Sequence, residues 1–166
     1  SGSDIRYPSG TSDLHHEVEL VVALKSGGTD IAESQALAHV FGYGVGLDLT
    51  RRDLQAKAKA KGMPWDTAKG FDASAPVSAI VPVARSGHPA QGALALEVNG
   101  QVRQQGDVAD MVHPVPEIIA ELSKLFELKA GDLIFCGTPS GVGPLVAGDS
   151  FRATFAGIAT LEGRIV

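Results

Sequence analysis

The residues from Leu14 to Ala23 alternate as a β-strand does when one of its faces is buried. Because successive side chains of a strand point to opposite faces, the apolar residues 18, 20 and 22 share one face, and Glu17 and Glu19 share the other. Carboxylates two residues apart lie about 6–7 Å apart along a strand, so their side chains can converge on one point. If that face is buried, a cation must neutralise the pair. The alternative is the solvated face of an edge strand.

A second alternating run, residues 43–50, offers a third carboxylate. Gly44, Gly46 and Asp48 share one face of this strand. Since glycine weakens a strand, two glycines on one face predict that another group approaches closely there. Asp48 is therefore a candidate to join Glu17 and Glu19. Three carboxylates form a hard oxygen donor set, which suits Mg²⁺, Mn²⁺ or Ca²⁺ better than zinc.

The composition is that of an ordinary globular domain, with 44% hydrophobic and 20% charged residues among 166. A net charge of −5 argues against nucleic acid or an anionic membrane as the main partner. No apolar run approaches the roughly 18 residues of a membrane span. The one cysteine, Cys136, excludes an intrachain disulfide, so we expect a reducing, cytoplasmic location.

Glycine and proline punctuate many short apolar runs, which predicts short strands joined by tight turns. Helices are predicted over 31–40 with Asp30 as N-cap, over 51–61 with Gly62 after the end, and after Pro114 with an apolar stripe of residues 118, 119, 122, 125 and 126. Strands are predicted at 77–83, 133–136, 150–155 and 159–166, and Asn99-Gly100 predicts a hairpin of 93–98 with 101–105. This order is not a regular βαβ repeat, so we expect an α+β, mostly β roll.

Several common motifs are absent. The glycines at 42, 44 and 46 lack the dinucleotide-binding spacing, and Ser140 lies in no nucleophile elbow. No His-Glu-x-x-His spacing exists, and His16 alternates onto the apolar face, which favours a core or surface histidine over a ligand. Cys136 lies in an apolar strand, where an inert buried thiol is expected.

Four runs that follow one another along nearly the whole chain resemble the fumarylacetoacetate hydrolase family, and most closely its acylpyruvate and fumarylpyruvate hydrolase branch. They are SDLHHEVEL (12–20), GYGVGLDLTRRDLQ (42–55), GMPWDTAKGFD (62–72) and GTPSGVGP (137–144). Each run alone is a weak signal, but four in the same order are specific. The resemblance implies a mixed β-sandwich roll with a few short helices, and a homodimer.

By this resemblance the metal ligands are Glu17, Glu19 and Asp48, as the strand faces also suggest, with Mg²⁺ or Mn²⁺ as cofactor and Ca²⁺ as a substitute in vitro. It further implies that Lys69 and Gln55 bind substrate oxygens and stabilise the developing oxyanion. Arg52 and Thr138 would line the same pocket, with Thr138 near the substrate carboxylate. From the residues alone, Lys69 could be a solvated amine, and Arg52 could pair with Asp53 or Asp66.

The implied reaction is hydrolysis of a C–C bond in a 2,4-diketo acid, as in aromatic catabolism. The substrate carboxylate and 2-oxo group would chelate the cation, water would attack the distal carbonyl, and a metal-bound pyruvate enolate would leave. The family also contains oxaloacetate decarboxylases and isomerases of unsaturated diacids, which use related enolate chemistry.

Family members carry an N-terminal lid whose His and Glu activate the attacking water, and nothing before Tyr7 resembles it. The histidines at 15, 16, 39, 88 and 113 either adjoin or follow the metal motif, so we predict no catalytic histidine in this chain. The expectation is one C-terminal-type catalytic domain over 1–166 without the lid. A non-catalytic metal- or ligand-binding module is then the alternative from another class.

Overall fold

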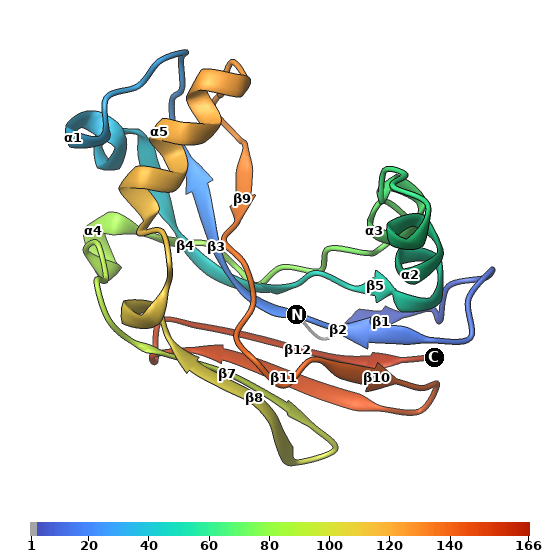
Figure 1. Cartoon of the computed structure of the whole chain (residues 1–166). Helices are drawn as coiled ribbons and strands as arrows, with labels where there is room; N and C mark the ends of the chain where they lie inside the picture. Colours follow the sequence, from blue (N-terminus) through green and yellow to red (C-terminus); the bar gives the residue numbers. More distant parts are fainter. Residues whose placement is uncertain (1–2) are drawn as a thin grey trace.

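The computed structural model describes residues 3–166, which form three β-sheets and a few short helices (Figure 1). In spatial order, the first sheet contains β1 (Ser3–Ile5), β12 (Ala159–Ile165), β11 (Ser150–Phe155), β7 (Ala93–Val98) and β8 (Gln101–Asp107). The second contains β10 (Gly143–Leu145), β2 (Leu14–His16) and β5 (Thr50–Arg51). The third contains β6 (Val81–Pro82), β4 (Val40–Leu47), β3 (Val18–Leu24) and β9 (Leu133–Phe135). The predicted α+β, mostly β class is confirmed.

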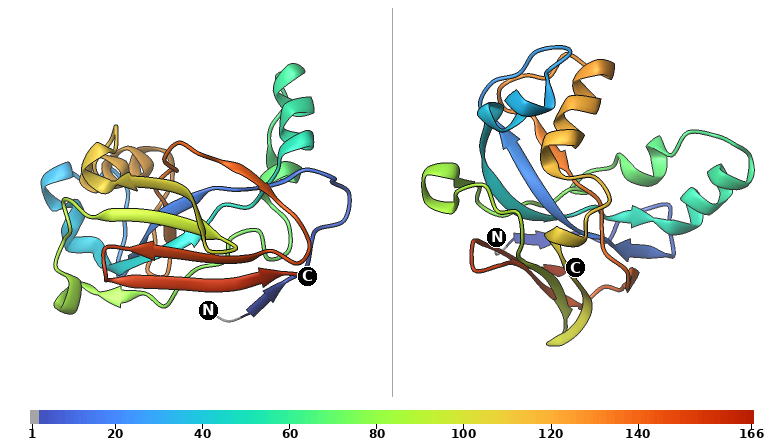
Figure 2. Two further views of the ribbon diagram at one scale, coloured as in Figure 1. Left: turned by 90° about the horizontal axis from the view of Figure 1, so that it is seen from below. Right: turned by 60° about the vertical axis from the view of Figure 1, so that its left-hand side comes forward.

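The helices lie in two groups. The α-helices are α1 (Glu33–Ala36), α2 (Arg52–Ala60), α3 (Asp66–Lys69), α4 (Val83–Ser86) and α5 (Val115–Leu125), and the 3₁₀ turns are η1 (Leu37–His39) and η2 (Val108–Asp110). Helices α1 and α5 pack together at one end of the third sheet, while α2 and α3 lie beyond its other end (Figure 1). Helix α2 buries none of its residues and projects from the body (Figure 2). Among the described residues, no helix combines the length and the apolarity that a membrane span requires.

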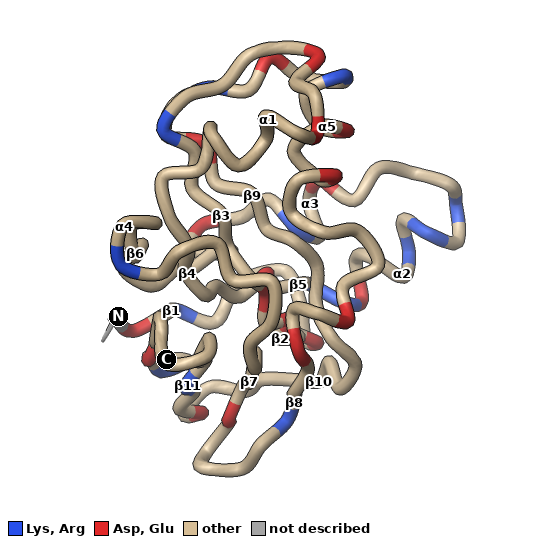
Figure 3. Tube along the Cα trace, turned by 90° about the vertical axis from the view of Figure 1, so that its left-hand side faces the viewer, with Lys and Arg blue, Asp and Glu red and all other residues tan. Residues whose placement is uncertain are grey.

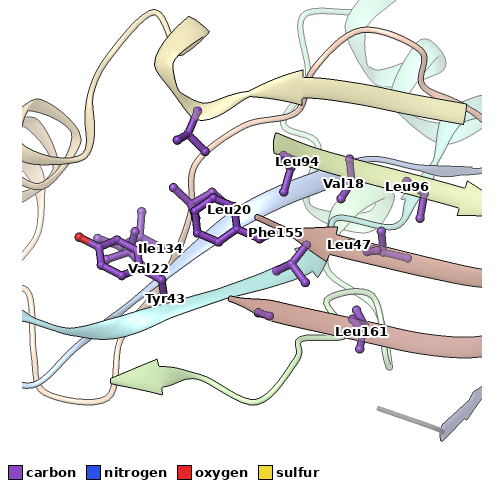
Figure 4. Close-up of a cluster of buried hydrophobic side chains, with 14 of the residues drawn as sticks. Val18, Leu20, Val22, Tyr43, Leu47, Leu94, Leu96, Ile134, Phe155 and Leu161 are labelled. Atoms are coloured by element: carbon purple, nitrogen blue, oxygen red, sulfur yellow. The ribbon is translucent and has the colours of Figure 1, made fainter. Parts of the chain in front are cut away.

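The main core lies between the first and third sheets. Side chains of β3 and β4 pack against those of β7, β11 and β12 (Figure 4). Val18, Leu20 and Val22 are at most 1% exposed, which confirms that this face of the strand is buried. Burial of each such side chain contributes about 1.5–3 kcal/mol, so this face anchors β3 firmly.

Strand β3 pairs with β4 on one side and β9 on the other, so the edge-strand alternative is wrong. The strand predicted over 14–23 is in fact divided at Glu17, where the chain passes from the second sheet into the third. The backbone N–H of Asp48 donates to the carbonyl oxygen of Glu17 over 2.8 Å at this junction. Two of the three acidic residues are therefore held together where the two sheets meet.

The helix predicted over 31–40 is wrong in its length. Asp30 has a φ of 50° in the left-handed region, Ala32 is the N-cap, and only Glu33–Ala36 are α-helical. Val40 already begins β4, where it pairs with Leu24 of β3. Pairing of two apolar strands has overridden the local helical pattern, since it buries more apolar surface than a short helix can.

Two predicted strands are shorter than expected. The run over 43–50 forms β4 only up to Leu47, and Thr50 begins β5 in a different sheet. Of residues 77–83, only Val81–Pro82 form a strand, and Val77 makes an isolated bridge to Gly46. Because Pro82 cannot donate to a ladder, the pairing ends there and α4 follows.

The other predicted elements agree with the structure to within one or two residues at their ends. Asn99 and Gly100 have φ values of 53° and 75°, as the tight hairpin turn requires. In α5, Ile119 is fully buried, but Leu125 and Phe126 are 75% and 60% exposed, so the predicted stripe is wrong at its end. Strands β1 and β10 were not among the predicted elements.

Gly44 and Gly46 of β4 are close to other groups, as predicted. A Cβ atom at Gly46 would lie 2.6 Å from Cε1 of Phe135 and 2.9 Å from Cγ2 of Val21. A Cβ atom at Gly44 would lie 2.9 Å from both Ile80 and Ser78. Gly46 thus allows the Phe135 ring of β9 to cover the strand that leads to Asp48.

We expect Gly46→Ala to lower the free energy of unfolding by about 1–3 kcal/mol, because the added methyl group overlaps the Phe135 ring. The controls are Phe135→Leu alone and Phe135→Leu combined with Gly46→Ala. If the two residues act through this contact, the double variant loses less free energy than the sum of the single losses, as measured by urea unfolding. Additive losses would contradict the contact.

Candidate functional site

Three carboxylates converge where the second and third sheets meet. Glu17, Glu19 and Asp48 each place an oxygen atom within 4.8 Å of the others. Glu19 on β3 is 4% exposed, while Glu17 and Asp48 are half-buried. The predicted convergence is confirmed, and it arises because β3 and β4 are antiparallel neighbours in which Val18 pairs with Leu47.

Two basic side chains reach the carboxylates from helices that flank the sheet. The ammonium group of Lys69, at the end of α3, donates to Glu17 Oε2 over 2.9 Å and to Asp48 Oδ2 over 2.5 Å. Arg52, at the start of α2, donates from Nη2 to Glu17 Oε1 over 2.6 Å. Lys69 is therefore not a solvated amine. The alternative pairing of Arg52 with Asp53 or Asp66 is wrong, since its acidic partner is Glu17.

Gln55 lies one turn further along α2 and is oriented by the same arginine. Arg52 Nη1 donates to Gln55 Oε1 over 2.5 Å. A guanidinium group can only donate, so the amide oxygen of Gln55 faces Arg52 and its amide N–H₂ group is left to donate to a ligand. This orientation agrees with the predicted role of Gln55 as a donor to substrate oxygens, which stays a prediction.

The three carboxyl groups have different proton affinities. Burial, together with the charges of Asp48 and Glu17, raises the pKa of Glu19 to about 7, although the backbone N–H of Gly137 donates to it over 2.7 Å. Burial also raises the pKa of Asp48, against the opposing effect of Lys69. For Glu17 burial acts in the same upward direction, but hydrogen bonds and charges from Lys69 and Arg52 outweigh it and lower the pKa.

The donor set fits a hard divalent cation. All three groups are oxygen donors, and Glu19 makes no ion pair among residues 3–166 although it is nearly buried. A buried carboxylate without a cationic partner is costly, and a bound divalent cation would remove that cost. Glu17, Glu19 and Asp48 are the residues that would hold Mg²⁺ or Mn²⁺ here.

Thr138 follows Gly137, whose N–H contacts Glu19. It lines a cavity of about 460 Å³ together with Leu20, Cys136 and residues of η2 and α5. Leu20 and Glu19 point to opposite faces of β3, so this cavity and the carboxylates lie on opposite faces of the strand, and the turn that contains Gly137 and Thr138 borders both. The predicted role of Thr138 at the substrate carboxylate stays a prediction.

Each histidine contacts a residue outside the carboxylate cluster. His16 is 1% exposed and contacts Gln104, which confirms that it is a core histidine. The other pairs are His15 with Asp13, His39 with Ser26, His88 with Tyr43 and His113 with Glu117. Burial raises the pKa of the Cys136 thiol to about 12, in agreement with an inert thiol.

Sequence reasoning missed Gln104. This buried amide on β8 contacts residues on both sides of Glu17 and also Thr138. The glutamine-rich run 101–105 gives no hint of it, because its partners are more than 30 residues away along the chain. Only the tertiary structure brings them together.

Together, the mixed β fold and the carboxylate cluster with its lysine are the features of a protein that could hold a divalent cation. The chain belongs to the fumarylacetoacetate hydrolase family, since the model of the fumarylacetoacetate (FAA) hydrolase C-terminal region matches residues 1–166. The family predicted from the four sequence runs is therefore confirmed.

Individual relatives agree with this assignment. The chain is 47% identical over 162 residues to a fumarylpyruvate hydrolase of Ralstonia sp., covering 98% of this chain and 84% of the relative. It is 48% identical over 151 residues to an oxaloacetate tautomerase of Escherichia coli, covering 90% and 69%. A crystal structure of fumarylpyruvate hydrolase from Pseudomonas aeruginosa in complex with Mn²⁺ and pyruvate matches with a TM-score of 0.98 and 44% identity, covering 100% and 71%.

We expect Glu19→Gln to stabilise the metal-free protein at pH 8. When folding raises the pKa of a carboxyl group, the free energy of unfolding falls as the pH rises from the pKa of the unfolded state to the pKa of the folded state, here about 7. An amide does not titrate, so the variant avoids this loss. The gain approaches about 3 kcal/mol at pH 8 and vanishes near pH 4. Thermal unfolding at both pH values measures it, and Mn²⁺ should no longer raise the melting temperature.

The matched control is Glu17→Gln. It leaves Lys69 and Arg52 without their shared carboxylate, so the metal-free protein should lose stability at pH 8 instead of gaining it. If both variants changed stability in the same direction, the assigned difference between the two carboxyl groups would be wrong.

Proposed function

We propose that this protein is a divalent-metal-dependent hydrolase that cleaves a C–C bond in 2,4-diketo acids of the acylpyruvate or fumarylpyruvate type. The observation that carries the proposal is Lys69, whose ammonium group lies against two carboxylates of the candidate cation site and beside the Arg52–Gln55 pair. The relatives from Ralstonia sp. and Pseudomonas aeruginosa, named as fumarylpyruvate hydrolases, support the same substrate class.

Glu17, Glu19 and Asp48 would hold the divalent cation, which would supply Lewis acidity to substrate oxygens. The protein side chains bind the substrate oxygens and stabilise the charge that develops on them. Lys69 places a positive charge where negative charge develops on substrate oxygens, and the amide N–H₂ group of Gln55 donates to the same region. Arg52 keeps that amide in orientation through its 2.5 Å hydrogen bond.

Water is the only co-reactant that the cleavage requires. Water adds to the distal carbonyl carbon, the bond between that carbon and C3 breaks, and its electrons pass into the pyruvate fragment as an enolate. A proton then returns to C3, so that the products are pyruvate and a carboxylic acid. The half-buried site keeps the charges of Lys69 and the carboxylates effective, since ion pairs are stronger away from bulk water.

Oxaloacetate tautomerisation is a second candidate, favoured by the Escherichia coli relative. Decarboxylation of oxaloacetate and isomerisation of unsaturated diacids are further alternatives, because all of these reactions develop charge on an enolate oxygen. Parallel assays with fumarylpyruvate and with enol-oxaloacetate separate the hydrolase, the tautomerase and the decarboxylase. Pyruvate release from fumarylpyruvate supports the hydrolase, loss of the enol without CO₂ release supports the tautomerase, and CO₂ release supports the decarboxylase.

We further propose Mg²⁺ as the cofactor, a homodimer as the assembly and the cytoplasm as the location. Hard oxygen donors support Mg²⁺, and the Mn²⁺ complex of the Pseudomonas aeruginosa relative supports Mn²⁺ as a substitute. The single cysteine agrees with a reducing location. A non-catalytic module remains the competing proposal if the chain binds Mn²⁺ and pyruvate but turns over none of these substrates.

We expect Lys69→Ala to lower kcat/KM for fumarylpyruvate at least about 100-fold, because the charge that stabilises the developing oxyanion is lost. Mn²⁺ affinity should be unchanged or higher, since an ammonium group no longer competes for Glu17 and Asp48. Lys57→Ala, at an exposed position of α2, is the control and should leave both values unchanged. Unchanged turnover in Lys69→Ala would remove this residue from the mechanism.

A further inference from the structure

We propose that Gln104 is a positioning residue that fixes both halves of the site with one buried amide group. Its oxygen holds the segment that carries Glu17, and its nitrogen orients the hydroxyl group of Thr138 toward the substrate. The inference rests on the proposed function in one respect, namely that Thr138 contacts the substrate carboxylate.

The amide of Gln104 uses its full capacity for hydrogen bonds in a place that is 1% exposed. Its Oε1 accepts from Nδ1 of His16 over 2.8 Å and from the backbone N–H of Val18 over 3.1 Å. Its Nε2 donates to Oγ1 of Thr138 over 2.8 Å and to the carbonyl oxygen of Pro139 over 2.9 Å. Strand β8 is thereby joined to the junction of β2 with β3 and to the turn after β9.

The partners determine which end of the amide is oxygen. The backbone N–H of Val18 can only donate, and the carbonyl oxygen of Pro139 can only accept, so Oε1 faces Val18 and Nε2 faces Pro139. It follows that Nδ1 of His16 carries a hydrogen atom. It also follows that Thr138 accepts a hydrogen bond from Gln104.

A β-bulge turns Gln104 inward. Leu96 pairs with Gln104, whereas the next residue, Glu97, pairs with Val102, so Arg103 is the additional residue of β8. Bulges re-aim side chains, and here the outcome is a buried Gln104 between exposed neighbours. Gly141 then packs on this bulge, because a Cβ atom there would lie 2.4 Å from the carbonyl oxygen of Arg103.

The oxygen side of the amide controls the position of Glu17. The residues immediately before and after Glu17 are bound to the same oxygen atom, so the backbone that carries this carboxylate is held from both sides. A residue at the boundary of two sheets would otherwise follow the movement of either sheet. Gln104 therefore acts on the cation site through the backbone that carries Glu17.

The nitrogen side controls the direction of the Thr138 hydroxyl group. Because Oγ1 already accepts from Gln104, its own hydrogen atom is directed away from the amide and can donate to an anionic group. A hydroxyl group that donated to residue 104 would instead present lone pairs to a substrate carboxylate. Gln104 thus decides whether Thr138 attracts or repels that carboxylate.

The test measures Mn²⁺ affinity and the affinity of the Mn²⁺-loaded protein for pyruvate in four variants, at pH 8. Gln104→Glu keeps the acceptor for His16 and Val18 but removes the donor to Thr138 and to the carbonyl oxygen of Pro139. Gln104→Met removes the acceptor and the donor. Thr138→Val removes the hydroxyl group, alone and combined with Gln104→Glu. Ser123→Ala is the control, because Ser123 is equally buried and lies in a different part of the fold. Its hydroxyl group accepts from the backbone N–H of Ile31, before α1, and donates to the carbonyl oxygen of Ala120 on α5.

We expect Gln104→Glu to bind Mn²⁺ no more weakly than the parent but pyruvate at least about tenfold more weakly, since a hydrogen bond to a charged group is lost. Gln104→Met should weaken both affinities about tenfold or more. In the Thr138→Val background, Gln104→Glu should change pyruvate affinity less than about twofold, because the two residues act in series. Ser123→Ala should change neither.

The inference would be overturned if Gln104→Glu weakened pyruvate binding by the same factor in the presence and in the absence of the Thr138 hydroxyl group. Unchanged Mn²⁺ affinity in a folded Gln104→Met variant would also overturn it. If Gln104→Met does not fold, the Gln104→Glu and Thr138→Val pair decides alone. Binding changes as expected in a protein that does not cleave fumarylpyruvate would refute the proposed function and leave the role of Gln104 standing. A parent protein that does not bind pyruvate would refute both.

Discussion

Three carboxylates held within 4.8 Å of one another repel each other strongly, and the site is arranged around this repulsion. Lys69 and Arg52 compensate the charge of Glu17, Lys69 also compensates Asp48, and a backbone N–H is the only hydrogen-bond donor to Glu19 among the described contacts. The compensation is therefore incomplete at the most buried member. Incomplete compensation is what a cation site requires, because a fully neutralised cluster would have no free energy to gain from a bound ion.

The fold supports this arrangement with antiparallel pairing and small residues. Strand β3 is central, its apolar face is buried against the first sheet, and its other face carries Glu19. Glycine at position 46 lets the Phe135 ring cover the path to Asp48, and the turn after β9 then delivers the N–H of Gly137 to Glu19. Arg52 of α2 and Lys69 of α3 both contact Glu17, and Figure 3 shows basic residues along the backbone of α2.

Residue periodicity identified the carboxylate cluster as a candidate, because strand alternation is a local property. It places Glu17 and Glu19 on one face of their strand and Asp48 on the face that carries Gly44 and Gly46. The Asn99-Gly100 hairpin was predictable for the same local reason. The helix over 31–40 and the strand over 77–83 were predicted incorrectly, because pairing with distant strands determines those segments. The role of Lys69 came from family resemblance, and Gln104 was missed because a bulge of β8, which no short pattern reveals, turns it inward.

Helix α2 carries Arg52 and Gln55, yet none of its residues is buried. Its attachment to the body includes polar contacts near its first turn, such as Arg52 with Glu17 and Thr11 with Asp53. Segments with so few apolar contacts open locally at low free energy. Amide hydrogen exchange should therefore be faster in this helix than in β3. The conformational entropy lost when a ligand orders the helix offsets part of its binding free energy, so ligands that do not reach Gln55 escape this cost.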